Sequence, residues 1–475
     1  MESVLAIDLG ATSGRGVLYW IEDGLLKAEE LSRFENIPIK ERGNLCWNSH
    51  QLMEHIVHTI KLAQEKSDLQ SVGIDTWGVD FALLDSQGEL IAQPVHYRDS
   101  RTEGILEEVA AYSSLEELYY KTGNQIMEIN TLFQLIRLKN RQPDQYYKAD
   151  RLVMVSDYLN YMLTGQIAIE KTIASTMQLL NPYTREWNKE LLASFEIADN
   201  LFPSLVKPGN ILGRIQEKWG IRASKVINVC QHDTASAIAS IPDDEERVLY
   251  ISSGTWSLIG TVLSSPLISK ESYDKEFTNE FGIDDSITFL KNCTGLWIFE
   301  ELRRQFKEQG QEYSFQMITE MIENCQEDVA RIDTENPEFA SAGNMIEKIT
   351  AYAQRTNQVL PSSPAHYFKI AYYGLAEKYK QVISELEKLL GYSFEKLYLL
   401  GGGSKSNYFS QLVAEVTGKT VVTGLYEATS IGNALVQFKA LGYVEDMKEA
   451  KELVKESITF NYFYPKEEEE NDTIS

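Results

Sequence analysis

The sequence predicts an α/β protein built from two related domains. From residue 4 to residue 78 the pattern is strand, strand, strand, helix, strand, an order typical of a sheet covered by helices. A second strand–turn–strand pattern begins near residue 247 and places Gly254 where the first pattern places Gly10. The 475 residues suffice for two or three domains, and a hydrophobic fraction of 43% is typical of globular proteins.

The N-terminal elements follow from apolar runs and the turns between them. Residues 4–7, 16–20 and 26–34 read as strands, and two glycines and two hydroxyl residues between the first two predict a tight hairpin. Asn48 can cap a helix, and residues 72–78 read as the next strand. The apolar positions of the helix recur every three or four residues: Leu52, Ile56, Ile60 and Ala63.

The second half of the chain repeats this alternation. Residues 247–251 and 256–262 form the second predicted hairpin. Apolar residues spaced by three and four predict a long helix over 368–389, followed by a short strand at 396–400. Residues 409–416 then resemble a helix. The similarity to the first half is one of pattern rather than identity, so it suggests duplication without establishing it.

A polar, turn-rich segment at 241–246 separates the two halves. We expect domains at 1–242 and 243–460, because boundaries fall in such linkers. Residues 461–475 contain four consecutive glutamates and are predicted to form an acidic, disordered tail.

Composition and charge exclude several classes of function. The formal net charge is −25, which disfavours both a basic nucleic-acid surface and attraction to an anionic membrane. Four cysteines stand far apart, without C-x-x-C or zinc-type spacing, which indicates free thiols in a reducing compartment. The N-terminus lacks the basic region of a signal peptide, and no uncharged apolar run could span a bilayer. We therefore expect a soluble cytoplasmic protein, either monomer or dimer, with no nucleic-acid or membrane partner.

The first glycine-rich turn, DLGATSGR at 8–15, follows a buried strand. Small residues let backbone N–H groups approach phosphate oxygens, and the hydroxyls of Thr12 and Ser13 add donors. Arg15 brings positive charge, and Asp8 at the strand end could hold Mg²⁺ through water. The alternative is an ordinary hairpin that needs a glycine.

Two more turns have similar chemistry. SSGTWS at 252–257 lacks the acid, and GGGS at 401–404 lies between a strand and a helix, where backbone could contact a base or ribose. Neither turn has the spacing of a dinucleotide site or of a P-loop. Each is weak evidence alone, but three such turns in one chain suggest a nucleotide held by two related domains.

The segment QHDTASA at 231–237 follows an apolar run at 226–229. Phosphoryl transfer to an alcohol needs a carboxylate that accepts the hydroxyl proton, and Asp233 is placed for this role. The alternative is a helix N-cap, which is a common role for aspartate. His232 taken alone is more often a packed histidine than a ligand.

Together and in this order, these motifs resemble the FGGY family of carbohydrate kinases, from Val4 to about Gln437. The resemblance rests on the three turns, the His-Asp pair and EATSIGNA at 427–434. It implies two ribonuclease H-like domains, as in actin and hexokinase, with a catalytic cleft between them. It also implies ATP and Mg²⁺ as cofactors and a small-molecule sugar as partner.

Within the family the sequence is most similar to the branch that phosphorylates L-rhamnulose at its 1-hydroxyl. Segments that carry this similarity are GIDTWGVDFALLD at 73–85, YRDSRT at 97–102, NTLFQL at 130–135, EKTIASTMQLLN at 170–181 and NCTGLW at 292–297. Thr-Trp-Gly stands where glycerol kinases carry Arg-Glu, which disfavours glycerol. L-fuculose and D-xylulose remain alternative sugars, and a nucleotide-dependent clamp or sugar sensor is the alternative outside kinases.

The resemblance also assigns expected roles to single residues. Asp233 is expected to be the catalytic base, and Asp8 the anchor for Mg²⁺-bound water. Glu300 stands where the family commonly has Gln near the nucleotide, so its role there is open. Trp77 and Trp297 could face the methyl group of a 6-deoxy sugar, or could be core residues. The remaining expected contacts are Gly78, His232, Thr234 and Asn292 to the sugar, and Ala11, Thr12, Ser13, Gly14, Arg15, Thr255 and Gly402 to the nucleotide.

Overall fold

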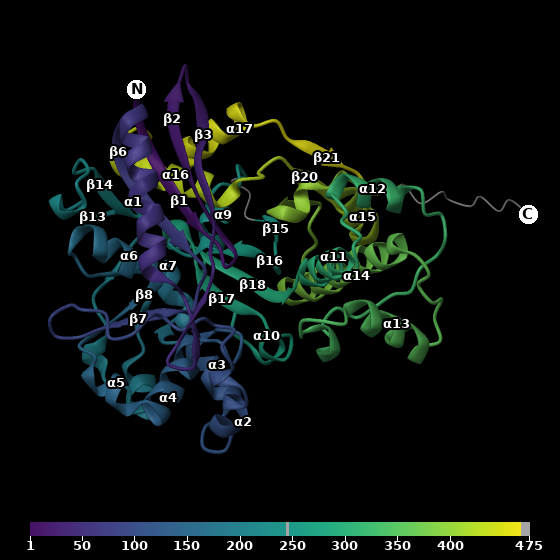
Figure 1. The fold of residues 1–475 in the computed structure, drawn as a ribbon, viewed down its shortest axis with the longest axis horizontal. Coiled ribbons are helices and arrows are strands. Elements are labelled where there is room, and N and C mark those ends of the chain that lie inside the picture. The colour runs from purple at the N-terminus through teal and green to yellow at the C-terminus, as the bar shows by residue number, and fades with distance from the viewer. Residues whose placement is uncertain (244–246, 467–475) are drawn as a thin grey trace, which may run out of the picture. The chain divides into compact units, whose positions relative to one another are not determined.

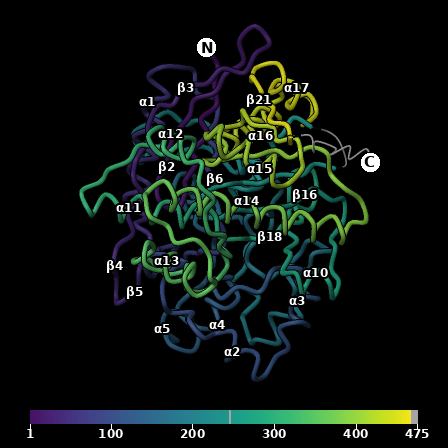
Figure 2. Tube along the Cα trace, turned by 90° about the vertical axis from the view of Figure 1, so that its right-hand side faces the viewer, coloured from purple at the N-terminus to yellow at the C-terminus, as the bar shows by residue number. Residues whose placement is uncertain are grey.

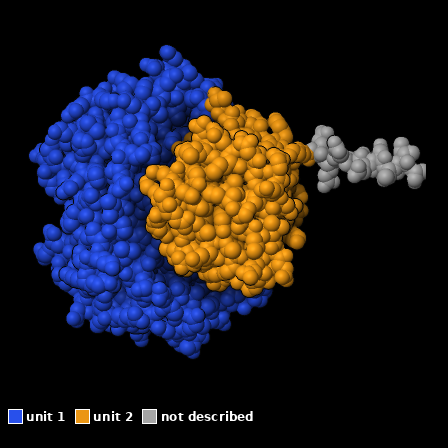
Figure 3. Space-filling model, turned by 45° about the vertical axis from the view of Figure 1, so that its right-hand side comes forward, with its two compact units in different colours: residues 1–246, 262–289, 427–458 blue, residues 247–261, 290–426, 459–475 orange. Residues whose placement is uncertain are grey.

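A computed structural model describes residues 1–243 and 247–466 as two compact units (Figure 3). Unit 1 comprises Met1–Glu246, Val262–Phe289 and Glu427–Ile458, and unit 2 comprises Arg247–Thr261, Leu290–Tyr426 and Thr459–Ser475. The chain therefore passes between the units several times, whereas the sequence pattern suggests a single boundary. The domain limits 1–242 and 243–460 stay a prediction.

Unit 1 contains a six-stranded mixed sheet in the order β13-β14-β6-β1-β2-β3 (Figure 1). β1 runs parallel to β6, and β6 runs parallel to β14, whereas β1–β2, β2–β3 and β13–β14 are antiparallel. The strands are β1 (Glu2–Leu9), β2 (Ser13–Glu22), β3 (Leu25–Glu35), β6 (Asp68–Thr76), β13 (Asn210–Arg214) and β14 (Lys225–Asn228). Their buried faces pack against α1 (Ser49–Lys66), whose N-terminus is capped by Asn48.

The register of this sheet gathers polar residues at one edge. In the parallel pair β1–β6, Asp8 lies opposite Asp75, and in the antiparallel pair β1–β2 it lies opposite Arg15. Thr76, the last residue of β6, forms a bridge with His232 just after β14. Because parallel strands end at the same edge, the residues that follow β1, β6 and β14 come together there.

A helix from the C-terminal part of the chain covers this sheet. α16 (Ala428–Leu441) contacts β1, β6 and α9 (Asp233–Ala239), so residues 427–458 fold with unit 1 rather than with their sequence neighbours. Gln437 donates to the carbonyl oxygen of Leu5 at 3.0 Å, and Asn433 donates to Asp75 at 2.6 Å. These buried polar contacts fix the position of α16 on the strands.

Many of the other elements of unit 1 contribute to a second hydrophobic core. α2–α5 gather at the end of unit 1 opposite the N-terminus in both views (Figures 1 and 2). The helices are α2 (Ile105–Ala110), α3 (Leu115–Thr122), α4 (Thr131–Arg141), α5 (Pro143–Lys148), α6 (Val155–Thr164), α7 (Lys171–Ala174), α8 (Lys189–Ser194), α10 (Lys270–Asp274) and α17 (Met447–Ser457). The short strands are β4 (Ile39–Glu41), β5 (Asn44–Cys46), β7 (Phe81–Leu84), β8 (Arg151–Met154), β9 (Ile169–Glu170), β10 (Leu180–Asn181), β11 (Glu186–Trp187), β12 (Leu205–Val206) and β17 (Thr278–Phe281).

Unit 2 repeats the strand order of unit 1. Its strands follow β18-β16-β15-β19-β20-β21, with β15 antiparallel to β16 and parallel to β19, which is parallel to β20. β15 thus corresponds to β1, and Gly10 and Gly254 each follow the equivalent strand directly, which confirms the predicted duplication. The strands are β15 (Leu249–Ser253), β16 (Trp256–Leu263), β18 (Ile287–Thr294), β19 (Lys396–Leu400), β20 (Thr420–Thr423) and β21 (Asn461–Phe463). The helices are α11 (Trp297–Glu308), α12 (Phe315–Glu323), α13 (Met345–Arg355), α14 (Pro364–Leu390) and α15 (Asn407–Thr417).

The predicted strands and helices are confirmed, but the predicted start of the disordered tail, at residue 461, is too early. Residues 461–463 form β21 and pair with β20, because backbone groups at that sheet edge are satisfied by another strand. The tail beyond residue 466 lies outside the described residues. Among the helices described for residues 1–243 and 247–466, none has the length and apolar character needed to cross a bilayer.

Candidate active site

Three aspartates converge at the carboxyl edge of the unit 1 sheet. Asp8 ends β1, Asp75 lies beside it on β6, and Asp233 follows β14 at the start of α9. Asp75 is fully buried, and its Oδ1 has no hydrogen-bond partner in the described part of the chain. Burial, reinforced by the neighbouring charge of Asp8, raises the pKa of Asp75 well above its usual value. The unpaired Oδ1 of Asp75 beside Asp8 fits the hydration shell of a hard divalent cation such as Mg²⁺.

Arg15 is held by two carboxylates of unit 1. Its Nε and Nη2 donate to Oδ2 of Asp8, the Nε at 2.8 Å, and its Nη1 forms an ion pair with Glu427 just before α16. Asp8 and Glu427 thus balance the positive charge of Arg15, which the sequence analysis assigned to phosphate binding. A guanidinium carries five N–H donors, so Arg15 keeps donors for a phosphate while both carboxylates stay bound.

The first hairpin turn is braced from β3. The side chain of Asn36 donates to the carbonyl oxygen of Gly10 at 2.9 Å, and its backbone N–H donates to the carbonyl oxygen of Thr12 at 3.0 Å. Thr12 is exposed and Ala11 and Ser13 are partly exposed, as a ligand-binding turn requires. Gly14 has a packing role instead, because a Cβ there would lie 2.5 Å from the ring of Phe34.

Asp233 is the first residue of α9, with His232 at the N-cap position. Its Oδ1 accepts the backbone N–H of Thr234 at 2.6 Å. The helix-capping alternative is wrong, because His232 occupies the N-cap position and no side chain caps α9. A third of the side chain (33%) nevertheless remains exposed. Burial raises the pKa of Asp233, the cationic form of His232 opposes this, and the charge of Asp8 adds to the rise. A raised pKa brings the carboxylate nearer to the range useful for a general base.

The backbone before Asp233 is fixed by a buried glutamate. Glu170 accepts the backbone N–H of Gln231 at 3.0 Å and the N–H groups of Thr172 and Ile173 at 2.7 and 3.2 Å. Thr76 donates its backbone N–H to the carbonyl oxygen of Gln231 at 2.9 Å. These contacts hold the segment against the sheet edge from two sides.

His232 lies between two carboxylates of unit 1. Its Nδ1 is 3.2 Å from Oε2 of Glu280, and its Nε2 is 3.5 Å from Oδ1 of Asp233. Burial lowers the pKa of His232, but the two nearby carboxylates outweigh burial and raise it above the usual value. Glu280 lies on β17, a strand that the sequence analysis did not connect with the site.

Trp77 and Gly78 follow β6 and lead into a buried polar network. Trp77 is 7% exposed and packs against Trp47 with 3.8 Å between ring centroids and the rings tilted by 33°. It donates its indole N–H to Asp80 at 3.0 Å. Gly78 is required here, since a Cβ would lie 2.9 Å from the side chain of Thr176. The network favours a core role for most of the Trp77 ring, with little surface left for a ligand.

Asp80 is the acceptor at the centre of that network. Its Oδ2 receives the indole N–H of Trp47 at 2.6 Å, that of Trp77, and the backbone N–H of Tyr97 at 3.0 Å, while Gln134 donates to Oδ1 at 3.1 Å. Burial raises the pKa of Asp80 to about 6, although these donors oppose the rise. Asp80 therefore links three segments that the sequence singled out separately.

In unit 2 the second and third glycine turns meet each other. A Cβ at Gly403 would lie 2.3 Å from Oγ of Ser253, and one at Gly401 would lie 2.8 Å from its carbonyl oxygen. Thr255 accepts the backbone N–H of Gly295 at 3.1 Å, which brings the segment after Asn292 to the same place. The turns that the sequence identified separately thus form one backbone-lined surface.

The residues expected near the nucleotide in unit 2 differ in exposure. Gly402 is exposed, whereas Thr255 and Asn292 are partly exposed. Glu300 is exposed on the first turn of α11 and forms an ion pair with Arg303 at 2.9 Å. The Arg303 pairing gives Glu300 a partner within its own helix.

One further group of metal-type ligands lies elsewhere in unit 2. Cys325, Glu327 and His366 place their ligand atoms within 4.8 Å of one another. However, Nδ1 of His366 accepts the backbone N–H of Ser362, so the neutral ring carries its proton on Nε2, which contacts Glu327. The ligand atoms of His366 and Glu327 therefore bind each other, and we assign no metal to this group.

Sequence analysis missed three acids of the unit 1 site: Asp75, Asp80 and Glu280. Asp75 and Asp80 lie inside GIDTWGVD, where an acid within an apolar run is an available signal. Glu280 gives no such signal, because its neighbours in sequence are far from the other site residues.

Comparisons with known proteins agree with this geometry. Residues 3–239 match the N-terminal domain of the FGGY family of carbohydrate kinases, and residues 249–441 match its C-terminal domain. A protein of Oceanobacillus iheyensis named Rhamnulokinase is 40% identical over 467 residues, covering 97% of this chain and 98% of that protein. One of Halalkalibacterium halodurans with the same name is 36% identical, covering 96% of this chain and 97% of that protein. A ligand-bound xylulose kinase of Lactobacillus acidophilus has a TM-score of 0.80 at 18% identity, covering 98% of this chain and 94% of that chain.

The fold is thus that of two-domain sugar kinases. Both halves of the chain match, and the relatives are similar along nearly their whole length. This chain belongs to the FGGY family of carbohydrate kinases.

Proposed function

We propose that this protein transfers the γ-phosphoryl group of ATP to the 1-hydroxyl of L-rhamnulose. The sugar is supported by relatives named Rhamnulokinase that are similar over nearly the full length of the chain. The chemistry is supported by the observation that carries the proposal: a partly exposed aspartate, Asp233, at the acidic edge of the unit 1 sheet.

Asp233 acts as the general base in this proposal. The carboxylate oxygen that does not bind Thr234 would accept the proton of the sugar hydroxyl, while the hydroxyl oxygen attacks the γ-phosphoryl group. The bond from Thr234 orients the other oxygen, so the carboxylate does not need to reorganise during the reaction. The raised pKa makes proton transfer more favourable than for an exposed aspartate.

Asp8 would hold Mg²⁺ through water, with the unpaired Oδ1 of Asp75 next to it. Bound there, Mg²⁺ neutralises charge on the β- and γ-phosphate oxygens. The exposed turn at Ala11–Ser13 offers backbone N–H groups and two hydroxyls to the same phosphates. Gly14 supports this turn by packing, and Arg15 would serve either as phosphate ligand or as the partner that orients Asp8.

The glycine surface of unit 2 would bind the rest of the nucleotide. Thr255 would contact phosphate, and Gly402 would let adenosine approach the backbone. Glu300 accepts hydrogen bonds but does not donate when ionised, so a contact to the nucleotide would use ribose hydroxyls or base N–H groups as donors.

The sugar would be bound by polar groups around Asp233. His232 and Thr234 flank the base, and Gly78 allows close approach. The sugar contact expected of Asn292, a residue of unit 2, stays a prediction. Trp77 would border the methyl group with the small part of its ring that remains accessible. A cytoplasmic location, expected from the sequence, stays a prediction.

The test is sugar-dependent ADP release with Mg-ATP. The panel is L-rhamnulose, L-fuculose, L-ribulose, D-xylulose and glycerol, with a control lacking sugar. We expect the highest kcat/KM with L-rhamnulose. Preference for another ketose would refute the sugar assignment and keep Asp233 as base. ADP release that is equal with and without every sugar would refute the kinase proposal.

A further inference from the structure

Glu280 is a buried acid that the proposed reaction does not use. It is 6% exposed and lies on β17, 47 residues after Asp233 along the chain. Apart from His232, no hydrogen-bond donor in the described chain reaches its buried Oε2. A buried carboxylate with one counter-group depends strongly on that group, because an unpaired buried charge is costly. Glu280 and His232 therefore form a coupled pair.

The contact with Glu280 fixes which ring nitrogen of His232 carries a proton. Nδ1 lies 3.2 Å from Oε2, and two lone pairs at this distance would repel, so Nδ1 is the protonated nitrogen. Nε2 then faces Oδ1 of Asp233 at 3.5 Å. In the cationic ring Nε2 is also protonated and stabilises the Asp233 carboxylate. In the neutral ring it is an acceptor for a sugar hydroxyl.

A buried backbone hydrogen bond holds β17 next to Glu280. The backbone N–H of Phe281 donates to Oγ of Ser175 at 2.9 Å, directly after the helix that Glu170 caps. The loop that follows β17 is clamped by cations from other segments: Lys207 binds Asp285 at 2.5 Å and Lys439 binds Asp284 at 2.6 Å. The buried bond of Phe281 limits movement of Glu280 away from His232, and the exposed ion pairs of the loop add little to it.

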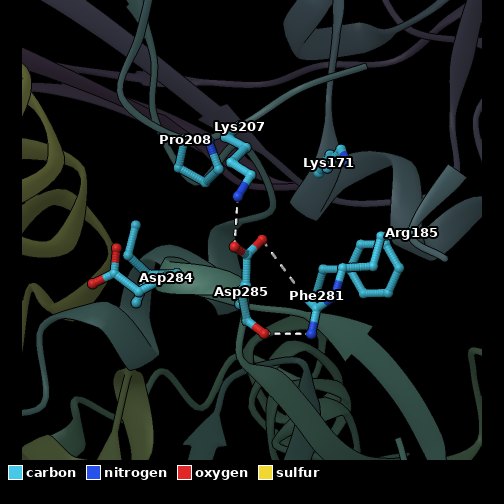
Figure 4. Close-up of a pocket in the computed structure, with 9 residues that line it drawn as sticks. Lys171, Arg185, Lys207, Pro208, Phe281, Asp284 and Asp285 are labelled. Carbon is cyan, nitrogen blue, oxygen red and sulfur yellow. Dashed lines mark hydrogen bonds and ion pairs between the residues drawn. The ribbon is translucent and has the colours of Figure 1, made fainter. Parts of the chain in front are cut away.

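Figure 4 shows the cluster at this loop, with Asp285 between Lys207 and Arg185. Arg185 also lies over the ring of Phe281 at 5.1 Å. The cavity there measures about 80 Å³, well below the roughly 300–1,000 Å³ of small-molecule sites. Since its cations already pair with acids, we interpret the cluster as support for β17 rather than as a ligand site.

We propose that Glu280 is a positioning residue of the phosphoryl-transfer site, which acts on Asp233 through the orientation and charge of His232. This inference rests on the proposed function. The negative charge of Glu280 favours the imidazolium form of His232, and the imidazolium keeps Asp233 ionised in spite of its burial. The charged groups around the pair are Glu170 beside His232, and Asp8 with its partner Arg15 and Asp75 beside Asp233.

The first test is the pH profile of kcat/KM for Glu280→Gln, measured with whichever ketose the unmodified protein phosphorylates. Glutamine keeps the shape and an acceptor oxygen but removes the charge. We expect the acid limb to move to higher pH by about one unit, so that kcat/KM on the acid side falls about tenfold and recovers on the alkaline side. A uniform fall at every pH, or an unchanged profile, would overturn the proposal. If the unmodified protein phosphorylates no ketose, the proposed function fails instead.

A matched control is Glu276→Gln, the same chemical change four residues earlier on an exposed position. We expect its profile to coincide with that of the unmodified protein, because exposed charges are screened.

A double-mutant cycle provides the second test. If Glu280 acts through His232, Glu280→Gln has no further effect on the profile in a His232→Asn background. Equal effects in both backgrounds would show that Glu280 acts by another route. The nitrogen chemical shifts of the His232 ring report the same coupling: we expect protonated Nδ1 in the unmodified protein and a lower titration midpoint in Glu280→Gln. Unchanged shifts and midpoint would contradict the proposal.

Discussion

Gly432 of α16 provides a sharp test of how the fold positions the base. A Cβ at this position would lie 1.8 Å from the carbonyl oxygen of Ser236 in α9, the helix that begins with Asp233. An ordinary contact is about 3.4 Å, so Gly432→Ala requires the two backbones to separate by about 1.6 Å. Both atoms that clash belong to rigid helices, and no rotamer change relieves the contact. The whole start of α9 is therefore expected to shift.

Two opposing effects act on stability in Gly432→Ala. Alanine in a helix interior is favoured over glycine by about 1 kcal/mol. Overpacking of a close contact costs about 1–3 kcal/mol, with the upper value expected for a backbone clash. We therefore expect a net loss of about 2 kcal/mol in the free energy of unfolding. Because a shift of about 1 Å in a catalytic group lowers rates about 10²-fold, kcat should fall by that order.

The assays are urea unfolding and steady-state kinetics with the preferred sugar. The matched control is Gly374→Ala, which is also in a helix interior. Its Cβ would meet side-chain atoms of Ile332 and Thr334 at 2.9 and 3.1 Å, and would lie 3.2 Å from the carbonyl oxygen of Ile332, a far milder contact than the 1.8 Å at Gly432. These side chains can move, so we expect a stability change within about 1 kcal/mol and unchanged kcat. A Gly432→Ala protein as stable as the unmodified one, with kcat within threefold, would refute the packing argument.

Three further predictions concern acids of unit 1. Asp233→Asn is expected to lower kcat about 10²–10⁴-fold with an unchanged unfolding curve, and kcat within a few-fold of the unmodified value would remove Asp233 from the role of base. Asp80→Ala leaves the donors of Trp47, Trp77 and Tyr97 without their acceptor and should cost about 3 kcal/mol in urea unfolding, whereas a loss below about 1 kcal/mol would contradict the network. Burial raises the pKa of Glu170 to about 7, although its hydrogen bonds oppose the rise. The folded state therefore binds the carboxyl proton of Glu170 more tightly than the unfolded state does. The stability that this proton contributes is present below about pH 4.5 and is lost as pH rises through 7. Glu170→Gln should flatten the pH dependence of stability between about pH 5 and 7, and an unaltered dependence would show that Glu170 is not its source.

Local sequence pattern was sufficient for the elements and for several site residues. The apolar run before Asp8 and the glycines after it predict β1 and its hairpin because strand and turn propensities act over a few residues. The same holds for α1 and its cap Asn48, and for Asp233 at the junction of an apolar run and a helix. The repeat was also visible, since Gly10 and Gly254 occupy equivalent turns.

The sequence by itself therefore determined the two related α/β halves, the glycine turns and the candidate base. Tertiary structure decided which distant residues meet at these points. Glu280 reaches His232 from β17, Glu427 binds Arg15 across more than 400 residues, and Gly432 brings α16 onto α9. The physical reason is that periodicity and turn chemistry act between near neighbours, whereas sheet register and helix packing join segments whose separation along the chain carries no local signal.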